Sequence, residues 1–146
     1  MTDISQQNKA VVTRFYNDVF LNHDMSKLDT YMRDDYIQHN EDCPQGKAGF
    51  IEFFDVIFKA IPDFKYKLLK MVAEGDIVMA FSTTLGTHAG SEWLGTAATG
   101  NKLEYNVVDI FRVRDGKIAE HWDVADTFTF FRQLGVIRNR LAELEK

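Results

Sequence analysis

The first half of the chain carries apolar residues at helical spacing. Between residues 7 and 21 they recur every three or four positions, which predicts an amphipathic helix. Residues 47–60 predict another helix, ending before Pro62 because the residue preceding a proline avoids helical backbone. Between the two, Ser26 is a candidate cap for a short helix, and "DDYIQHN" is irregular or extended. The short helix is expected to turn inward Leu28, Tyr31 and Met32.

After Pro62 the pattern changes to that of strands. "FKYKLLKMV" and "IVMAFSTTLGTH" flank the turn "EGD", and "KLEYNVVDIFRV" and "KIAEHWDVAD" flank "RDG", which predicts two hairpins joined by the loop "SEWLGTAATGN". The last twenty residues are helical but interrupted at Gly135, a residue suited to follow a helix end. Helices followed by antiparallel strands indicate an α+β fold, a curved antiparallel sheet with helices against one face.

Alternation along the last predicted strand divides its side chains between two faces. His121 and Asp123 share one face with Ala119 and Ala125. The other face carries Ile118, Glu120, Trp122, Val124 and Asp126.

The turn before this strand decides where Asp109 points. A three-residue loop ending in a left-handed Gly116 places Asp109 opposite His121 and diagonal to Asp123. A two-residue Asp-Gly turn would instead place Asp109 opposite Trp122, on the other face. We favour the three-residue loop with its bulge because it gathers the polar groups on one face.

Both faces of this hairpin are largely apolar. The first carries Tyr105, Val107, Phe111, Ala119 and Ala125, and the second carries Val108, Ile110, Ile118, Trp122 and Val124. If helices cover the first face, we expect the second to form a homodimer interface, since an exposed apolar patch of that size marks a contact surface. The small residues beside His121 and Asp123 leave room for a ligand cavity on the first face.

Composition narrows the class of protein. A chain of 146 residues with 45% hydrophobic content is large enough to bury one core, so residues 1–146 are expected to form one domain. A net charge of -5 with scattered basic residues argues against nucleic acid, and no apolar run approaches the roughly 20 residues of a membrane helix. The single Cys43 and the lack of a signal peptide favour a reduced, cytoplasmic location. The histidine spacing does not suggest a metal site.

Four motifs in order, "YIQHN", "LGTHAGSEWLGTAATGN", "DIFRVRDGKIAEHWDVAD" and "RQLGVI", resemble the SnoaL-like polyketide cyclases, a branch of the nuclear transport factor 2-like cone fold. The resemblance implies a sheet forming a cone with N-terminal helices on its inner face. It also implies cofactor-free aldol ring closure on a polyketide ester, with one cavity Asp as general acid/base. That role is assigned to Asp123; Asp126 is less suited, because it shares the Trp122 face and is placed to cap the final helix.

Other groups are expected to assist Asp123. His121, His39 and His88 could hold its proton or hydrogen-bond substrate oxygens, although His39 could equally anchor its own segment and His88 could pin the loop over the cavity mouth. The predicted catalytic residues are Asp123, His121 and His39. The predicted substrate-binding residues are Asp109, His88, Trp122, Tyr105 and Phe111, with Trp122 regarded as a packing residue first.

Three other functions stay open. The resemblance implies that epoxide hydrolysis in this fold uses two Asp carboxylates bridged by an Arg on the strand that carries Asp109. The position two before Asp109 is Val107, so the bridging Arg is missing and this function is disfavoured. Proton transfer like that of ketosteroid isomerase needs an acidic hydroxyl, from Tyr16 or Tyr105, in the cavity. A noncatalytic dimeric module that binds an apolar metabolite would be favoured if Asp123 were solvent-exposed or the interior filled by Phe side chains.

Overall fold

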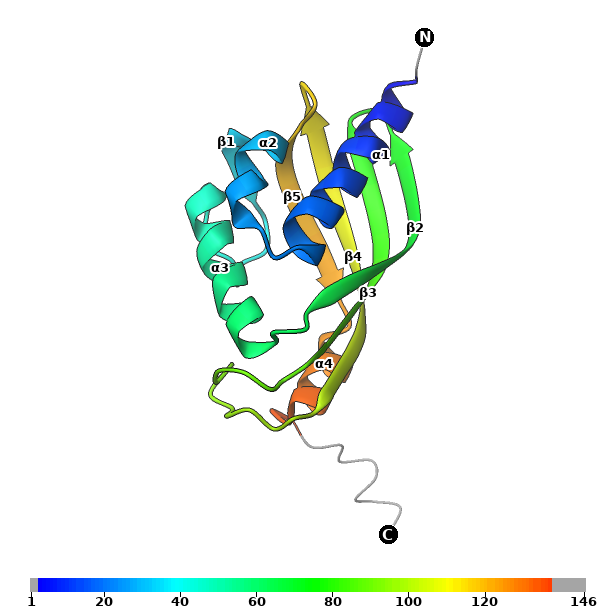
Figure 1. The fold of residues 1–146 in the computed structure, drawn as a ribbon. Helices are drawn as coiled ribbons and strands as arrows, with labels where there is room; N and C mark the ends of the chain where they lie inside the picture. The colour runs from blue at the N-terminus through cyan, green and yellow to red at the C-terminus, as the bar shows by residue number, and fades with distance from the viewer. Residues whose placement is uncertain (1–2, 138–146) are drawn as a thin grey trace.

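The computed structural model describes residues 3–137, in which five strands form one curved sheet with helices packed across one face (Figure 1). The strands are β1 (Met32–Gln38), β2 (Lys65–Glu74), β3 (Ile77–Thr87), β4 (Lys102–Arg114) and β5 (Lys117–Ala125). They lie in the order β1-β5-β4-β3-β2, and all neighbours are antiparallel except β1, which pairs parallel to β5. The α+β prediction is confirmed, and the segment expected to be irregular or extended is a parallel edge strand.

The first predicted helix is α1 (Ile4–Phe15) continued by one π-helical segment, η1 (Tyr16–Leu21). Asp3 caps α1 by accepting a hydrogen bond from the backbone N–H of Ser5. The wider π turn begins at Tyr16, which, at 3% exposed, faces the sheet. Such turns often occur at functional sites because they redirect side chains without ending the helix.

The short helix predicted to begin at Ser26 is preceded by a turn that another residue caps. Asp24, not Ser26, caps the 3-10 turn η2 (Met25–Lys27), since the Asp24 carboxylate accepts the backbone N–H of Ser26. The following helix α2 (Leu28–Tyr31) buries its apolar residues as expected, together with Met32 at the start of β1.

The remaining helices follow the sequence prediction. Helix α3 (Gly46–Ala60) ends at Ile61 before Pro62 and buries Phe50, Phe54 and Ile57. Helix α4 (Thr127–Leu134) starts after Asp126, whose carboxylate accepts the backbone N–H of Thr129, and ends at Gly135 with φ 92°. The predicted helical continuation after residue 137 lies outside the described residues. None of the helices in residues 3–137 is both long and apolar enough to cross a membrane.

The β4–β5 turn is the two-residue form, so the predicted three-residue loop is wrong. Asp115 and Gly116 both have positive φ, 51° and 72°, as a type I′ turn requires, and Arg114 pairs with Lys117. A bulge further along β5 then leaves Ala119 without a partner in β4. The two one-residue shifts cancel, so the polar residues of both strands still share a face.

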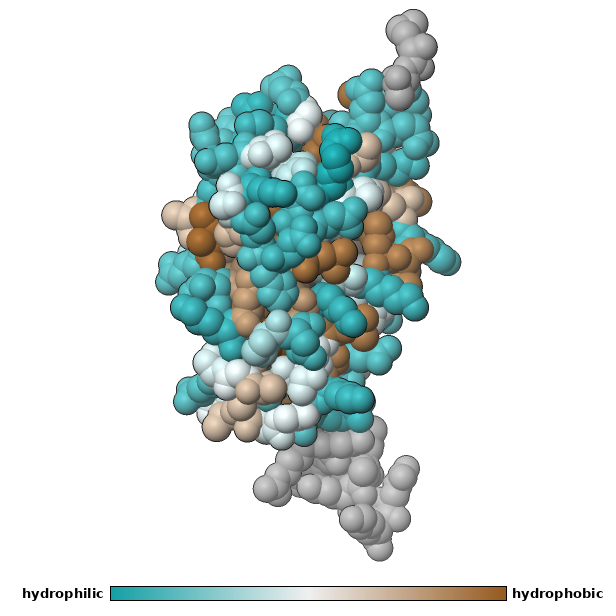
Figure 2. Space-filling view, in the orientation of Figure 1, coloured by the Kyte–Doolittle hydropathy of each residue, from teal (hydrophilic) through white to brown (hydrophobic). Residues whose placement is uncertain are grey.

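This bulge also corrects the predicted outer face. Ile118 lies before the bulge, is fully buried and belongs to the core, so it is not part of the outer apolar row. Val124, at 70% exposed, remains on the outer face beside Trp122. Hydrophobic side chains also reach the surface on β2, where Val72 is 63% exposed, and brown residues gather near that edge in Figure 2.

Candidate functional site

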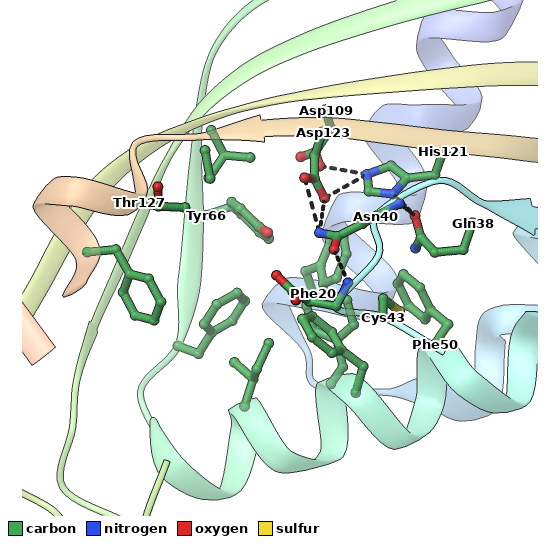
Figure 3. Close-up of a pocket in the computed structure, with 18 of the residues that line it drawn as sticks. Phe20, Gln38, Asn40, Cys43, Phe50, Tyr66, Asp109, His121, Asp123 and Thr127 are labelled. Carbon is green, nitrogen blue, oxygen red and sulfur yellow. Dashed lines mark hydrogen bonds and ion pairs between the residues drawn. The ribbon is translucent and has the colours of Figure 1, made fainter. Parts of the chain in front are cut away.

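A cavity of about 150 Å³ lies between the inner face of the sheet and the helices (Figure 3). Its helical wall is aromatic and comes from η1 and α3, with Phe20, Phe50, Phe53 and Phe54. Its sheet wall comes from β4 and β5, with Val107, Asp109, Phe111, His121 and Asp123. Polar groups on one wall therefore face an apolar wall across the space that a ligand would fill.

The register of β4 and β5 brings the polar groups together. Asp109 lies directly opposite Asp123, and Phe111 lies opposite His121. The sequence-based register had Asp109 opposite His121, so that pairing is wrong by one step along the face, although the shared face is right. Asp109 and His121 are almost fully buried, at 5% and 7% exposed.

Asp109 is satisfied by two donors. One carboxylate oxygen lies 2.8 Å from Nε2 of His121, and the other accepts a short hydrogen bond from the hydroxyl of Tyr16. Burial, and then the nearby Asp109 charge, raise the pKa of Tyr16 well above its usual value. Tyr16 therefore stays a neutral donor, and it supports Asp109 from the side away from His121.

Gln38 fixes the hydrogen position on His121. Its Oε1 accepts the backbone N–H of Asn40 at 3.1 Å, and its Nε2 donates to the hydroxyl of Tyr36 at 2.8 Å, so the amide has one orientation. Nδ1 of His121 lies 2.9 Å from that same Oε1. Nδ1 therefore carries a hydrogen, and Nε2 is the nitrogen that faces Asp109 and the cavity.

Asp123 lines the cavity and is more open than Asp109. The side-chain amide of Asn40 donates to both of its oxygens, at 3.1 and 2.8 Å, and Nε2 of His121 lies 4.0 Å from Oδ2. The Asp123 side chain is 21% exposed, against 7% for Asp109. A substrate in the cavity can thus reach Asp123 more readily than Asp109, whose two oxygens are engaged by His121 and Tyr16.

Gln38 and Asn40 were missed by the sequence reasoning. Both lie in "YIQHN", and strand alternation places Gln38 on the face opposite to His39. Reading this segment as a strand would have directed attention from the histidine to its two amide neighbours.

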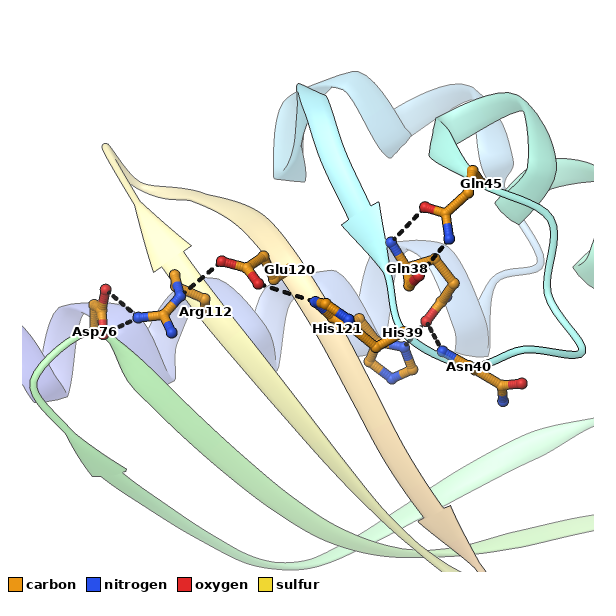
Figure 4. A network of polar contacts seen from close by, with 8 residues as sticks. All are labelled: Gln38, His39, Asn40, Gln45, Asp76, Arg112, Glu120 and His121. Atoms are coloured by element: carbon orange, nitrogen blue, oxygen red, sulfur yellow. Dashed lines mark hydrogen bonds and ion pairs between the residues drawn. The ribbon is translucent and has the colours of Figure 1, made fainter.

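The predicted site residues His39 and Trp122 lie on the outer face of the sheet, outside the cavity lining. Figure 4 shows His39 on this face beside Glu120. The His39 ring stacks on Trp122 with centroids 4.4 Å apart, and its Nε2 lies 3.0 Å from Glu120. Arg112 joins the same network by donating to Glu120 at 2.9 Å and to both oxygens of Asp76. Contact with His39, followed by Arg112, lowers the pKa of Glu120. This arrangement pins β1 against β5 from outside.

His88 is fully buried in the loop after β3 and does not line the cavity. Its Nε2 lies 2.9 Å from the carbonyl of Ser91, and its backbone pairs with Gly100 and Asn101. These contacts tie both ends of the loop together. The loop in turn places Trp93 in the cavity wall, 4.9 Å from the ring of Phe130.

Tyr105 and Phe111 line the cavity, as predicted for substrate-binding residues. Burial is the main cause that raises the pKa of Tyr105, so its hydroxyl stays protonated. Cys43 also lines the cavity, and burial raises the pKa of its thiol to about 11, which keeps it in the unreactive thiol form.

Asp109, His121 and Asp123 are also the residues that could approach a metal ion, since one ligand atom from each lies within 4.8 Å of the others. As they stand, Nε2 of His121 is directed at Asp109, and both oxygens of Asp123 accept from Asn40. A metal site would require Nε2 of His121 to turn from Asp109 to the ion and the three groups to close in. The arrangement is that of a hydrogen-bonded acid–base cluster.

The chain was compared with known families and structures. The profile of the family described as SnoaL-like polyketide cyclase matches residues 10–134. No curated protein matches the chain closely enough to count as a relative.

Several solved structures share this fold. TsrD from Streptomyces laurentii is 26% identical with a TM-score of 0.81, covering 90% of this chain and 97% of that one. AclR from Streptomyces galilaeus, a candidate hydroxylase, is 26% identical with a TM-score of 0.82, covering 92% and 99%. IdmH from Streptomyces antibioticus, a candidate polyketide cyclase, is 27% identical with a TM-score of 0.75, covering 88% and 99%. Different activities are thus assigned to proteins with one architecture, so the site must decide the chemistry.

Proposed function

Because the chain belongs to the SnoaL-like polyketide cyclase family, we propose that it closes a ring by intramolecular aldol chemistry on a small apolar carbonyl compound. The observation that carries the proposal is the arrangement on the sheet wall. Asp123 opens to the cavity, and the buried Asp109–His121 pair lies directly beside it. Two groups able to take up or release a proton thus border one apolar space.

The reaction needs one proton to move twice. The Asp123 carboxylate takes a proton from a carbon flanked by carbonyls, which breaks a C–H bond. The electron pair left on that carbon forms the new C–C bond to the acceptor carbonyl carbon, whose π electrons move to its oxygen. Asp123 then returns the proton to this oxygen, giving a hydroxyl group. The atoms balance without an added oxidant, reductant or cofactor.

The neighbouring groups orient the reaction. Asn40 holds the Asp123 carboxylate by donating to both oxygens, and Asp109 holds His121 with Nε2 near the reacting region. Tyr105 lines the cavity, and its protonated hydroxyl is a candidate donor to a substrate oxygen. The aromatic wall holds the substrate chain folded, and such positioning can supply about 7–11 kcal/mol of the barrier in favourable cases.

Deuterium exchange provides a test that does not require the natural substrate. Acetophenone has one ring and an exchangeable methyl group beside its carbonyl, and its slow exchange in D₂O is followed by NMR. Wild-type protein is expected to accelerate the exchange, and Asp123→Asn to reduce that acceleration by about 100-fold or more, the usual contribution of general acid–base catalysis. Equal acceleration by both proteins would show that Asp123 is not the base.

Asp126→Asn is the matched control. Asp126 caps α4 and lies outside the cavity lining, yet its substitution removes the same charge, from -5 to -4, as Asp123→Asn does. It is expected to exchange acetophenone at the wild-type rate. A loss of exchange in Asp126→Asn alone would support Asp126 as the acid/base group.

The three alternative functions are supported to different extents by the residues that line the cavity. A noncatalytic binding module is supported by the aromatic lining, and it would bind acetophenone without exchanging its protons. Proton transfer like that of ketosteroid isomerase is supported by Tyr105, whose ring lines the cavity, while Tyr16 is engaged with Asp109. Epoxide hydrolysis lacks support, because the apolar Val107 occupies the position of the bridging Arg.

We also propose that the outer sheet face forms a homodimer. Val124 and Val72 are 70% and 63% exposed, and Met79 is 43% exposed between them in the sheet order. Exposed apolar residues on one face are typical of a subunit contact. Native mass spectrometry is expected to detect a dimer, and Val124→Asp is expected to shift it to a monomer. A wild-type monomer would contradict the proposal.

A further inference from the structure

The charges lining the cavity are all of one sign or belong to histidine. Asp42, Asp109 and Asp123 contribute carboxyl groups, whereas no Lys or Arg among residues 3–137 reaches the lining. Several basic groups form ion pairs away from the cavity: Arg33 with Asp35 and Asp115, Lys47 with Asp29 and Asp34, and Arg112 with Asp76 and Glu120. The cavity thus provides no fixed cation for an anionic ligand, and its carboxylates disfavour one.

The carboxylates of Asp109 and Asp123 differ in the hydrogen-bond donors that they receive. Asp109 receives Nε2 of His121 at 2.8 Å together with the hydroxyl of Tyr16. Within residues 3–137, the close donor to Asp123 is the neutral amide of Asn40, because Nε2 of His121 is 4.0 Å away and directed at Asp109. A carboxylate that faces an apolar space with only a neutral donor is stabilised further by a cation.

Aromatic residues make up half of the lining of the cavity that Asp123 faces. Of the 22 residues that line the cavity in the described part of the chain, 11 are Phe, Tyr or Trp. Ring faces carry partial negative charge and attract organic cations, especially ammonium groups that have lost part of their water. Rings and a carboxylate together match a ligand with an apolar body and one positive charge.

We infer that the cavity selects its ligands by charge: it favours compounds that combine an apolar ring with an ammonium group, accepts neutral ones less well, and rejects carboxylates. The ammonium group pairs with Asp123, and the ring lies against the aromatic wall. This selection goes beyond the proposed reaction and does not depend on it. Where both hold, the substrate is an amine-bearing or uncharged carbonyl compound rather than a free acid.

Three ligands of nearly equal size test the inference. Benzylammonium, benzyl alcohol and benzoate differ mainly in charge, and a cavity of about 150 Å³ is large enough for one benzene ring. Titration calorimetry measures each affinity, and the side-chain amide NMR signals of Asn40 report whether the ligand binds beside Asp123. Benzylammonium is expected to bind about tenfold tighter than benzyl alcohol, and benzoate more weakly than both.

Two variants with the same net charge distinguish binding beside Asp123 from a general effect of the protein's charge. Asp123→Asn is expected to reduce benzylammonium affinity to that of benzyl alcohol, while Asp126→Asn, with the same net charge, keeps the wild-type order. The inference is overturned if Asp123→Asn retains the preference, if benzoate binds best, or if benzylammonium does not bind the wild type. Because these are equilibrium affinities, their failure is distinct from a failure of acetophenone exchange, which measures proton transfer.

Discussion

Tyr16→Phe removes a single hydroxyl group from beneath the candidate site. The ring of Tyr16 contacts Phe20, Tyr66 and Phe111, and these contacts persist in the variant because the ring remains. The hydroxyl is the donor to one oxygen of Asp109, a residue that is 5% exposed. The substitution therefore leaves a buried carboxylate oxygen without its donor and changes little else.

The cost follows from the charge and burial of the acceptor. A hydrogen bond to a charged group contributes about 1.5–3 kcal/mol, and burial prevents water from replacing the lost donor. We expect Tyr16→Phe to lower the free energy of unfolding by about 2 kcal/mol, which for a chain of this length corresponds to a fall of about 4–8 °C in Tm. Urea and thermal denaturation, followed by circular dichroism, measure both quantities.

Tyr31→Phe is the matched control, because it makes the same chemical change at another Tyr–Asp pair. The hydroxyl of Tyr31 donates to Asp18, and this pair is only partly buried. Water can replace that donor, so the expected loss is about 0.5–1 kcal/mol. Equal losses in the two variants would refute the argument that Asp109 depends on Tyr16 for a buried hydrogen bond.

Two further predictions concern the hydrogen-bond networks on either side of β5. Gln38→Met removes the acceptor of the Nδ1 hydrogen of His121 and is expected to change the ¹⁵N chemical shift of that nitrogen, which long-range ¹H–¹⁵N NMR measures. An unchanged spectrum would contradict the role of Gln38. His39 and Arg112 lower the pKa of Glu120 from the usual value of 4.5. The contribution of Glu120 to the free energy of unfolding is therefore present above pH 4.5 and is lost as the pH falls through the lowered pKa. Glu120→Gln is therefore expected to be less stable than wild type near neutral pH, with the difference shrinking in acid, and a difference that grows in acid would contradict the sign.

The elements of the fold were predictable because their signals are local. Helical spacing, the proline after α3, the turn residues between strands and the Asp126 and Gly135 caps each act within a few residues. The cap at Asp24 was missed because Ser26 is an equally good capping residue on composition alone. Only the backbone geometry shows that Asp24 accepts the N–H of Ser26, not the reverse.

The register of the site depended on two features that offset each other. The turn at Gly116 is two residues long, which alone would turn Asp109 to the outer face, and the bulge at Ala119 turns it back. An alanine in a strand gives no sign of a bulge, because its small side chain fits either face. The shared face of Asp109 and Asp123 was therefore predicted correctly from a turn that the structure does not contain.

The choice of histidines shows a second limit. His39 and His121 are chemically equivalent in the sequence, yet β1 pairs in parallel with β5 and its alternation sends them to opposite faces. Parallel edge pairing between segments more than 80 residues apart leaves no periodic pattern in either segment. For the same reason, the contacts of Gln38 with His121 and of Asn40 with Asp123 could not be predicted from the residue pattern.

The role of Asp123 as the group that moves the proton is tested by the rate of acetophenone deuterium exchange by Asp123→Ala, with and without added formate. We expect the variant to lose the acceleration and formate, by entering the space left by the missing carboxylate, to restore part of it. His121→Ala keeps Asp123 in place, so added formate is expected to leave its rate unchanged. Exchange by Asp123→Ala at the wild-type rate would contradict the assignment of Asp123 as the group that moves the proton.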